Sequence, residues 1–338
     1  MRRLLVVLSL LFGFLMSGAP ALAAAAAKPL YRDPVYDGAA DVSSIYDRAR
    51  HVWTMFYTNR RATLKLPDRK DVAWVHGTPI GMATSKDGLK WTYKGMAKFP
   101  AECTGETLWA PEMYYENGTY HMWLTVVPGI FHSWGGGATS KIVHLTSPDL
   151  TTWTCSDTLS TGSERIIDPS VIKLPNGGYR LWYKDERAGS RIFAVDSPDL
   201  KTWTKVLDKP VIDTNAEGPK VFFFKGYYWL IADKWDGLLV LRSDDAATWT
   251  PQDDHILKEP GTKPTDNAKG QHADVIVNGD HAFIYYFVHQ ANAPEAKTDP
   301  YWGQRTVIQV AELKYADGKL TVDREATVDT PLKAPVDK

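Results

Sequence analysis

One short pattern recurs four times along this chain and constrains its fold more than any other feature. Each copy reads Ser-x-Asp, then three residues, then Trp; the copies begin at Ser85, Ser147, Ser197 and Ser243 and end at Trp91, Trp153, Trp203 and Trp249. Ser and Asp side chains bond nearby backbone groups in tight turns. We interpret each copy as a turn whose Trp opens the next strand and packs into the core. Such internal repetition is typical of propellers, solenoids and arrays.

A second repeat precedes the first in each unit. A short apolar strand begins at an acidic or polar residue, a turn follows, and an aromatic strand comes next. The starting residues of these five strands are Asp41, Glu112, Asp168, Glu217 and His272. Several of the turns, such as Asn117-Gly118 and Asn278-Gly279, have the residues that tight hairpins prefer.

Together the two repeats predict five units of about four strands each, which is typical of β-propeller blades. The units span residues 33–96, 106–157, 164–209, 215–254 and 270–324. No segment has sustained helical periodicity, and an alternative pair of β-sandwiches predicts no fivefold recurrence. We therefore expect an all-β chain with a single five-bladed β-propeller, four-stranded blades around a central axis, as the catalytic domain of residues 24–338. The turn pattern also resembles the Asp-box.

The first 23 residues have the pattern of a secretory signal peptide. Arg2 and Arg3 form a basic start, residues 4–16 are apolar, and Ala21-Leu22-Ala23 resembles a cleavage site. The apolar run is too short to remain in a bilayer, and no Cys follows it that could carry a lipid. We expect an exported protein, periplasmic or extracellular, without a membrane anchor.

Charge and cysteine content exclude several classes of partner. The formal net charge is −1, which argues against nucleic acid because nucleic-acid-binding proteins need a basic surface. Cys103 and Cys155 lack the spacing of zinc ligands, so no metal site is predicted from them. An oxidising compartment would allow these two residues to pair, and the sequence leaves both the pairing and the oligomeric state open.

The five starting residues gain significance from propeller geometry. The first strand of each blade lines the central axis, so residues far apart in sequence become neighbours on one face. Four of the five are carboxylates, and a carboxylate cluster is unfavourable unless it has a chemical task or a cation to hold. Glycoside hydrolysis needs such a set: one carboxylate activates water and a protonated one donates to the leaving oxygen.

These residues resemble the signature of glycoside hydrolase family 43. The resemblance rests on Asp41, on Asp168 in Asp-Pro-Ser-Val, on Glu217 in Glu-Gly-Pro, on Trp109-Ala-Pro and on His272. Families 32, 62, 68 and 117 share the five-bladed fold. The resemblance implies that Asp41 is the general base, Asp168 the pKa modulator and Glu217 the general acid. No cofactor is required, although a structural cation near His272 on the propeller axis is compatible with it.

Other residues are predicted to bind an oligosaccharide substrate. They are Glu112, Trp109, Arg60, His76, His272 and Arg305, the last matching an arginine that faces the sugar in several relatives. Two insertions, residues 61–77 and 127–140, are expected to form loops over the upper face. Trp74, His132 and Trp134 within them fit either a sugar-stacking wall or ordinary loop packing.

Two assignments have rivals within the sequence. Asp33, which precedes Pro34, and Asp37 compete with Asp41 for the role of base; we prefer Asp41 for its spacing to Trp53. Family 117 enzymes use a His as a proposed acid, so a His could replace Glu217; the candidates are His76, His132, His272 and His289. The Asn-Asp-Pro motif of families 32 and 68 is absent.

The function predicted from these observations is an exo-acting, inverting glycoside hydrolase. Its expected substrate is a terminal α-L-arabinofuranoside-like sugar on plant or algal oligosaccharides. The alternatives are an anhydro-galactosidase acting on agar-type oligosaccharides and a non-catalytic carbohydrate-binding propeller. A sialidase-like enzyme is disfavoured because that chemistry occurs in a six-bladed fold with a Tyr nucleophile. The sugar, its linkage and the anomeric outcome stay open.

Overall fold

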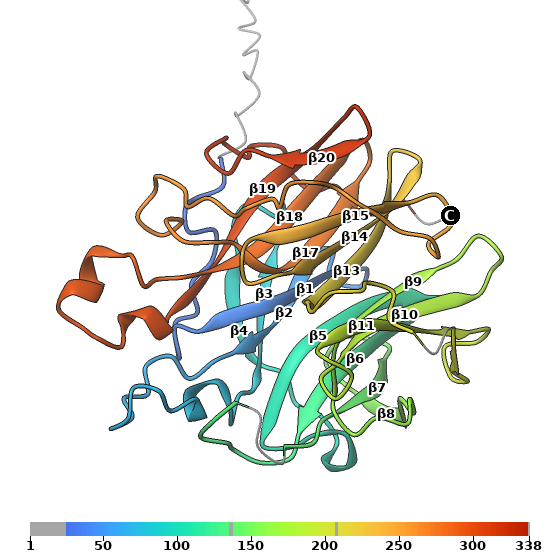
Figure 1. Ribbon diagram of the computed structural model, residues 1–338, viewed down its shortest axis with the longest axis horizontal. Coiled ribbons are helices and arrows are strands. Elements are labelled where there is room, and N and C mark those ends of the chain that lie inside the picture. The colour runs from blue at the N-terminus through green and yellow to red at the C-terminus, as the bar shows by residue number, and fades with distance from the viewer. Residues whose placement is uncertain (1–24, 135–137, 207–208, 337–338) are drawn as a thin grey trace, which may run out of the picture.

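The computed structural model describes residues 25–134, 138–206 and 209–336, and the predicted signal peptide lies outside them. The described chain forms five four-stranded antiparallel sheets, each built from consecutive strands (Figure 1). The strands are β1 (Ala39–Asp47), β2 (Val52–Asn59), β3 (Ile80–Ser85) and β4 (Thr92–Met96); β5 (Thr107–Glu116), β6 (Thr119–Val127), β7 (Lys141–Ser147) and β8 (Thr154–Thr158); β9 (Ile166–Lys173), β10 (Tyr179–Asp185), β11 (Arg191–Ser197) and β12 (Thr204–Lys205); β13 (Glu217–Phe224), β14 (Tyr227–Asp233), β15 (Leu238–Ser243) and β16 (Thr250–Pro251); β17 (Gln271–Asn278), β18 (His281–His289), β19 (Thr306–Ala316) and β20 (Lys319–Val322).

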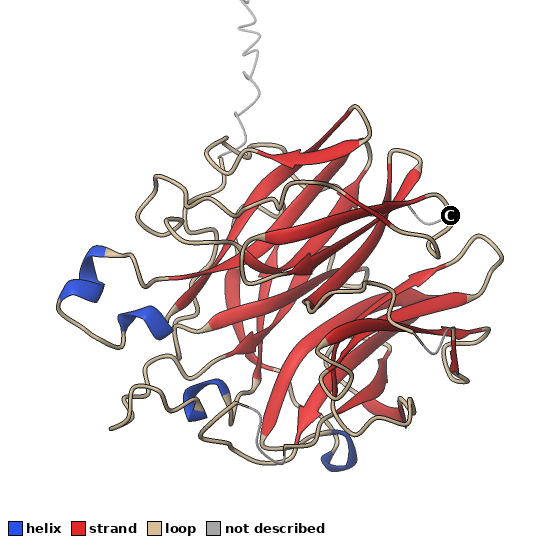
Figure 2. Cartoon of the chain, viewed as in Figure 1, coloured by secondary structure: helices blue, strands red, loops and turns tan. Residues whose placement is uncertain are grey.

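These sheets are the blades of a five-bladed β-propeller, as the repeats predict. The inner strands β1, β5, β9, β13 and β17 each contact the inner strands of two neighbouring blades, and β17 closes on β1. Helix is confined to four short 3-10 turns in the described loops: η1 (Ala73–Val75), η2 (Ala101–Cys103), η3 (Pro294–Lys297) and η4 (Trp302–Gln304) (Figure 2). Among the described residues, no helix is long and apolar enough to span a bilayer.

The hydrophobic core is divided among the seams between blades. Five buried clusters each combine side chains from two adjacent blades, including the cluster that joins the first blade to the fifth. Burial of apolar surface between sheets is therefore what holds the ring together. The blades depend on one another because each supplies one half of two cores.

The repeated Ser-x-Asp turns and their tryptophans organise these seams. In the first copy the Asp87 carboxylate accepts the backbone N–H groups of Leu89 and Lys90 at 2.8 and 3.0 Å. Each following Trp then packs edge-on against an aromatic ring of the blade before it, at centroid distances of 6.0 to 6.2 Å. The pairs are Trp91–Tyr285, Trp153–Phe56, Trp203–Trp123 and Trp249–Trp182. Tyr315 and Trp229 make the corresponding contact at the fifth seam.

The two ends of the described chain fasten the ring between the first and fifth blades. Tyr31 pairs with Ile308 of β19, and the Leu332 N–H donates to the Asp87 carbonyl at 2.8 Å. Within the second blade, Cys103 and Cys155 form a disulfide with their Cα atoms 5.7 Å apart. The pairing that the sequence left open is thus present.

Every inner strand contains the same irregularity near its first residues. We call the face of the propeller at which the inner strands begin the upper face. Two of its residues lie opposite one residue of the second strand, which is a β-bulge. The first residue of each bulge has a positive φ; the five are Asp41 (48°), Ala110 (43°), Asp168 (58°), Gly218 (53°) and His272 (21°). Left-handed backbone is unfavourable for residues other than glycine and concentrates at functional sites. These five bulge residues are the true structural equivalents, and they surround the upper end of the axis.

Candidate active site

A cavity of about 440 Å³ lies at the upper end of the axis. Its lining comes from all five blades. It includes six of the nine residues that the sequence analysis predicts to be catalytic or to bind substrate. Those six are Asp41, Arg60, Trp109, Asp168, Glu217 and His272; the other lining residues are Trp74, Val75, Trp134, Ile167, Lys184, Glu186, Trp235, Gln271, Phe287 and His289. Carboxylates, cations and indole rings therefore converge on one concave site, as expected of a carbohydrate-processing enzyme.

Asp41 lies at the bulge of β1 between two cationic side chains. Its Oδ1 is 3.2 Å from Nη2 of Arg60 and 3.3 Å from Nδ1 of His272. Burial opposes the charge on Asp41, but Arg60 and His272 outweigh it and hold the pKa of this carboxyl well below its usual range. Burial likewise disfavours the His272 cation, yet Asp41 raises the pKa of His272 to about 9. Asp41 is therefore an ionised acceptor.

Glu217 is the last residue before the bulge of β13, and both of its oxygens accept hydrogen bonds. Nζ of Lys184 donates to Oε2 at 2.9 Å, and the indole N–H of Trp235 donates to Oε1 at 2.9 Å. Lys184 also lies 3.4 Å from Glu186. Although burial opposes its charge, these carboxylates, with Glu217 foremost, hold the pKa of Lys184 above its usual range. Two donors thus fix the Glu217 side chain at the cavity wall.

Two buried carboxyl groups flank Glu217 and have pKa values raised toward neutral pH. Burial, with repulsion from Glu217, raises the pKa of Asp168 to about 6, although His272 opposes the shift. The same causes raise the pKa of Asp233 to about 7. Asp168 accepts the Gly218 N–H at 3.0 Å, and Asp233 accepts the His272 N–H at 3.1 Å. Asp168 and Asp233 are therefore carboxyls that titrate near neutral pH, in contrast to the ionised Asp41.

The remaining walls of the cavity are largely aromatic. Trp74 comes from the first predicted loop and Trp134 from the second, and the two loops are joined by an ion pair of 2.8 Å between Asp71 and His132. Trp134 is 66% exposed, and Trp109 is anchored by its indole N–H to the Val75 carbonyl at 2.7 Å. Indole faces of this kind suit the apolar face of a sugar ring.

The structure corrects the expectation for Glu112. This residue lies two positions below the bulge residue Ala110, outside the cavity, and it is buried against Lys220, Ser43 and the backbone of Val171. Glu112 was grouped with Asp41 because it is the acidic residue at the start of its strand, whereas Ala110 is the residue at the bulge. The Ala110-Pro111 dipeptide was the available signal, because Asp168-Pro169 and Gly218-Pro219 have the same proline at the same place.

Arg305 and His76 are also absent from the cavity lining. The Arg305 guanidinium is 3.1 Å from Asp37 and stacks over Trp302, because a loop of the fifth blade holds it outside the site. Asp37, a rival of Asp41 for the role of base, is therefore paired with Arg305 and does not line the cavity. His76 lies behind the aromatic wall with its ring 5.0 Å from Trp109, and its Nδ1 is bonded to a backbone carbonyl. His76 therefore packs against the aromatic wall and does not line the cavity.

Sequence reasoning missed Lys184, which lines the cavity, and Asp233, which is buried beside Glu217. Lys184 and Asp233 lie at the ends of β10 and β14, opposite Ile167 and Glu217. Their signal was position: each lies in the last two residues of the second strand, where that strand reaches the upper face beside an inner-strand bulge. Asp33, the other rival of Asp41, is buried 2.6 Å from the Tyr57 hydroxyl and does not line the cavity.

The surroundings of His272 do not fit a bound cation. Its ring packs so closely on Gly218 that a Cβ there would be 2.5 Å from the imidazole, and its Nδ1 faces Asp41. Within residues 25–134, 138–206 and 209–336, no cluster of three His, Cys, Asp or Glu side chains is arranged to hold a metal. No step is therefore assigned to an ion.

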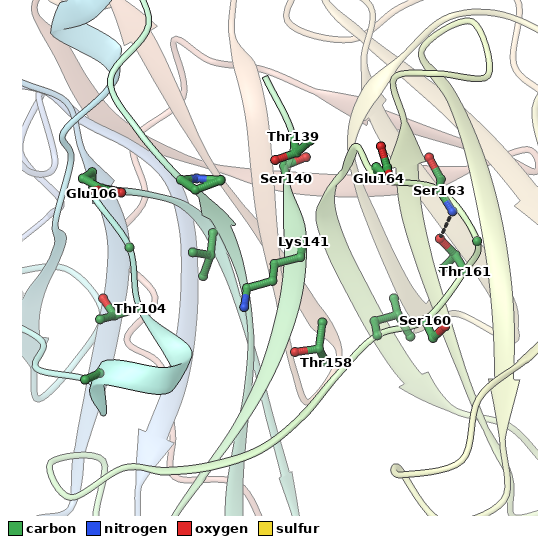
Figure 3. Close-up of a pocket in the computed structure, with 16 residues that line it drawn as sticks. Thr104, Glu106, Thr139, Ser140, Lys141, Thr158, Ser160, Thr161, Ser163 and Glu164 are labelled. Carbon is green, nitrogen blue, oxygen red and sulfur yellow. Dashed lines mark hydrogen bonds between the residues drawn. The ribbon is translucent and has the colours of Figure 1, made fainter. Parts of the chain in front are cut away.

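A larger open groove of about 1130 Å³ lies between the second and third blades (Figure 3). Hydroxyl side chains dominate its lining; Figure 3 shows Thr104, Thr139, Ser140, Thr158, Ser160, Thr161 and Ser163 around it. Its two carboxylates, Glu106 and Glu164, lie on opposite sides of the groove, and no aromatic ring lines it. The cavity at the axis is the better candidate because carboxylates and indoles meet there.

Comparison with known families gives one sequence match. Residues 45–275 match the family described as "probable glycosyl hydrolase domain", which is related to glycosyl hydrolase family 43. No curated protein matches the chain in sequence.

Solved structures resemble the chain at low sequence identity. A thermostable family-43 glycoside hydrolase is 16% identical, covering 91% of this chain and 100% of its own, with a TM-score of 0.65. A mutant α-L-arabinanase from Cellvibrio cellulosa is 15% identical, covering 85% and 96%, with a TM-score of 0.59. A family-43 β-xylosidase/α-arabinofuranosidase from a compost microbial metagenome, complexed with xylotriose in a calcium-free form, is 13% identical, covering 85% and 94%, with a TM-score of 0.59. At these identities the likeness demonstrates the fold.

Proposed function

This chain belongs to the family of probable glycosyl hydrolase domains related to family 43, and on that premise we propose that it is an exo-acting, inverting glycosidase. The observation that carries the proposal is the upper cavity itself. It combines an ionised carboxylate, Asp41, with Glu217, whose two neighbouring carboxyls, Asp168 and Asp233, have pKa values raised to about 6 and 7. Inverting hydrolysis needs one carboxylate and one protonated carboxyl on either side of the scissile bond.

In the proposed reaction, Asp41 accepts a proton from a water molecule. The water oxygen bonds to the anomeric carbon from one face while the bond to the leaving oxygen breaks on the other. Glu217 gives its proton to that leaving oxygen, and Asp168 and Asp233 are neighbouring buried carboxyls whose pKa values of about 6 and 7 let them exchange protons with it near neutral pH. His272 and Arg60 hold Asp41 in place.

The proposed substrate is a neutral sugar of the α-L-arabinofuranoside type at the end of an oligosaccharide. The cavity's cations Arg60, Lys184 and His272 are already paired with its carboxylates, so none is left over for a uronic acid. Trp74 and Trp134, which the two long loops bring over the cavity, support exo action by limiting its length. Two structural relatives are described as an arabinanase and a β-xylosidase/α-arabinofuranosidase, which places pentosides first among the substrates to be tested.

Export remains part of the proposal. The signal-peptide pattern of residues 1–23 directs the chain out of the cytoplasm, and a disulfide between Cys103 and Cys155 is compatible with an oxidising compartment. Fractionation of cells that express the full chain would test export. Recovery of the chain in the cytoplasm with its first residues intact would overturn it.

Sugar release by the purified protein tests the activity. The substrates are arabinofuranosides, xylosides and neoagaro-oligosaccharides, each with a natural or an activated aryl leaving group, and Glu217→Gln is assayed alongside. We expect release of one terminal monosaccharide by the wild type. The variant should lose at least about 10²-fold on natural leaving groups and less on aryl ones, because acid assistance matters less there. Equal losses on both would contradict the acid role, and release from neoagaro-oligosaccharides alone would favour the anhydro-galactosidase.

A further inference from the structure

Below the cavity, one side chain from each inner strand joins a closed ring around the axis. Each lies two residues beyond the bulge residue of its strand, and the five are Ser43, Glu112, Ser170, Lys220 and Asp274. We call them the axial ring.

Hydrogen bonds or ion pairs bridge all five seams of the ring. Ser43 donates to Glu112 at 3.2 Å, Ser170 donates to Glu112 at 3.5 Å, and Ser170 accepts the Val221 N–H at 3.0 Å.

Lys220 connects the fourth blade to the adjacent fifth blade and, across the axis, to the second. Its Nζ is 2.8 Å from Oε2 of Glu112 and 2.8 Å from Oδ1 of Asp274. The other Asp274 oxygen accepts the Ser44 N–H at 2.8 Å and so closes the ring on the first blade.

The ring contains one cation between two deeply buried anions. The Glu112 and Asp274 side chains are 5% and 2% exposed and the Lys220 side chain is 13% exposed. Two carboxylates this deep would repel each other strongly if nothing positive stood between them. Burial opposes the ammonium charge, but Asp274 and Glu112 hold the pKa of Lys220 above its usual range. The propeller axis therefore already holds a permanent positive charge.

We propose that the Lys220 ammonium is the axial cation of this propeller and takes the structural place of a bound metal ion. The chain supplies the charge covalently, which agrees with the poor fit of a cation beside His272. The consequence reaches the active site through the backbone. Lys220 is two residues from Gly218 and three from Glu217, and Asp274 is two residues from His272, so the ring fixes where those inner strands reach the cavity. This proposal does not depend on the proposed sugar chemistry.

Two measurements on the intact wild-type protein test the proposal. Elemental analysis of the purified chain should find far less than one metal ion per molecule. Prolonged treatment with EDTA should leave the melting temperature unchanged. Stoichiometric calcium that EDTA removes, together with a fall in melting temperature, would overturn the proposal. Neither readout needs an active enzyme, so failure of the glycosidase assay would not be confused with failure of this inference.

A cavity variant provides the positive test. Lys220→Ala should lower the melting temperature by roughly 10 °C, because it leaves Glu112 and Asp274 buried without a counter-charge. Millimolar methylammonium or calcium should restore part of that loss by entering the vacated place. The same ions should not restore the triple variant Glu112→Gln, Lys220→Ala, Asp274→Asn, which has no anions to hold them. Lys173→Ala is the matched control, since Lys173 makes an exposed ion pair with Glu116.

Each outcome of the variant experiment is decisive in one direction. A fall in melting temperature that small cations partly reverse supports the axial role of Lys220. A Lys220→Ala protein as stable as the Lys173→Ala control would contradict it, and so would equal restoration of the triple variant. If Lys220→Ala is recovered in folded form only when methylammonium or calcium is present during refolding, that dependence also supports the proposal.

Discussion

The cavity and the axial ring lie two residues apart on the same five inner strands, yet their charges are balanced in different ways. In the ring, each carboxylate oxygen accepts donors from its neighbours and Lys220 joins the two anions. At the cavity, Asp41 is strongly paired, while Asp168 and the buried Asp233 beside Glu217 have pKa values raised to about 6 and 7. Fully paired charges specify a structure, whereas carboxyls that titrate near neutral pH can exchange protons with a substrate.

The difference has a geometric origin in the bulge. Left-handed residues at each bulge redirect the inner strand. Side chains at the bulge or just before it therefore line the cavity, whereas the side chain two residues beyond the bulge joins the axial ring. A residue's function in this fold therefore depends on its register relative to the bulge more than on its type. Glu112 and Glu217 are both glutamates near the start of an inner strand, and only the second reaches the cavity.

The largest predicted effect comes from neutralising the cavity's ionised carboxylate. Asp41→Asn should lower kcat/KM by about 10³- to 10⁴-fold on natural and aryl glycosides alike, because water then lacks its proton acceptor. Initial rates together with circular dichroism would measure it. Appreciable activity in a folded Asp41→Asn protein would remove Asp41 from the role of base.

The same neutralisation in the ring should affect stability instead. Glu112→Gln breaks a buried ion pair with Lys220, and we expect a loss of about 3 kcal/mol in the free energy of unfolding. At temperatures where the variant is folded, its hydrolysis rate should stay close to that of the wild type. Urea denaturation and sugar release would be measured on the same sample. A variant that keeps its stability but loses hydrolysis would contradict the distinction between the catalytic cavity and the structural axial ring.

The pH profile probes the protons of the cavity. Asp168 and Asp233 are protonated below their raised pKa values of about 6 and 7 and lose those protons as the pH rises through them. Hydrolysis should therefore decline above about pH 7, approaching tenfold per pH unit. Lys184→Met removes a cation whose charge lowers the pKa of Asp168, so its decline should begin up to roughly one pH unit higher.

A matched lysine variant controls this experiment. Lys173→Met removes a cation from an exposed pair with Glu116 and should leave the profile in place. An unchanged profile for Lys184→Met, measured as kcat/KM against pH, would show that Lys184 does not influence the carboxyl groups whose titration sets the profile.

The smallest predicted effect concerns the exposed indole at the cavity rim. Trp134→Ala should lower kcat/KM for oligosaccharides up to about tenfold through lost stacking and should change aryl glycoside hydrolysis little. Phe223→Ala, an exposed aromatic elsewhere on the chain, is the control. Equal losses on both substrate types would show that Trp134 contacts the sugar that is cleaved, and not the distal end of the oligosaccharide.

The fold was predictable from the sequence because its signals are local and repeat five times. The Ser-x-Asp turns and aromatic strands fall within the blades that the structure contains. Asp41, Asp168, Glu217 and His272 could be placed at the axis because propeller geometry gathers the beginnings of blades.

What the sequence could not provide depends on pairing between strands. Lys184 reaches the cavity, and Asp233 lies beside Glu217, only because β10 and β14 lie beside inner-strand bulges. Glu112 was misplaced because it is the acidic residue near the start of its strand, whereas the bulge residue of that strand is the apolar Ala110. Arg305 was misplaced because the conformation of its loop, and hence its pairing with Asp37, is not encoded in any short motif.

Proton NMR of the first sugar product tests the central claim most directly. The wild-type protein is mixed with the α-L-arabinofuranoside, or with whichever substrate it cleaves, and the anomeric signals are followed before mutarotation. The account predicts release of a free sugar whose first anomer is opposite to that of the substrate, because Asp41 directs water to the face away from the leaving group. First appearance of the retained anomer would contradict this account and would indicate a covalent intermediate on a cavity carboxylate.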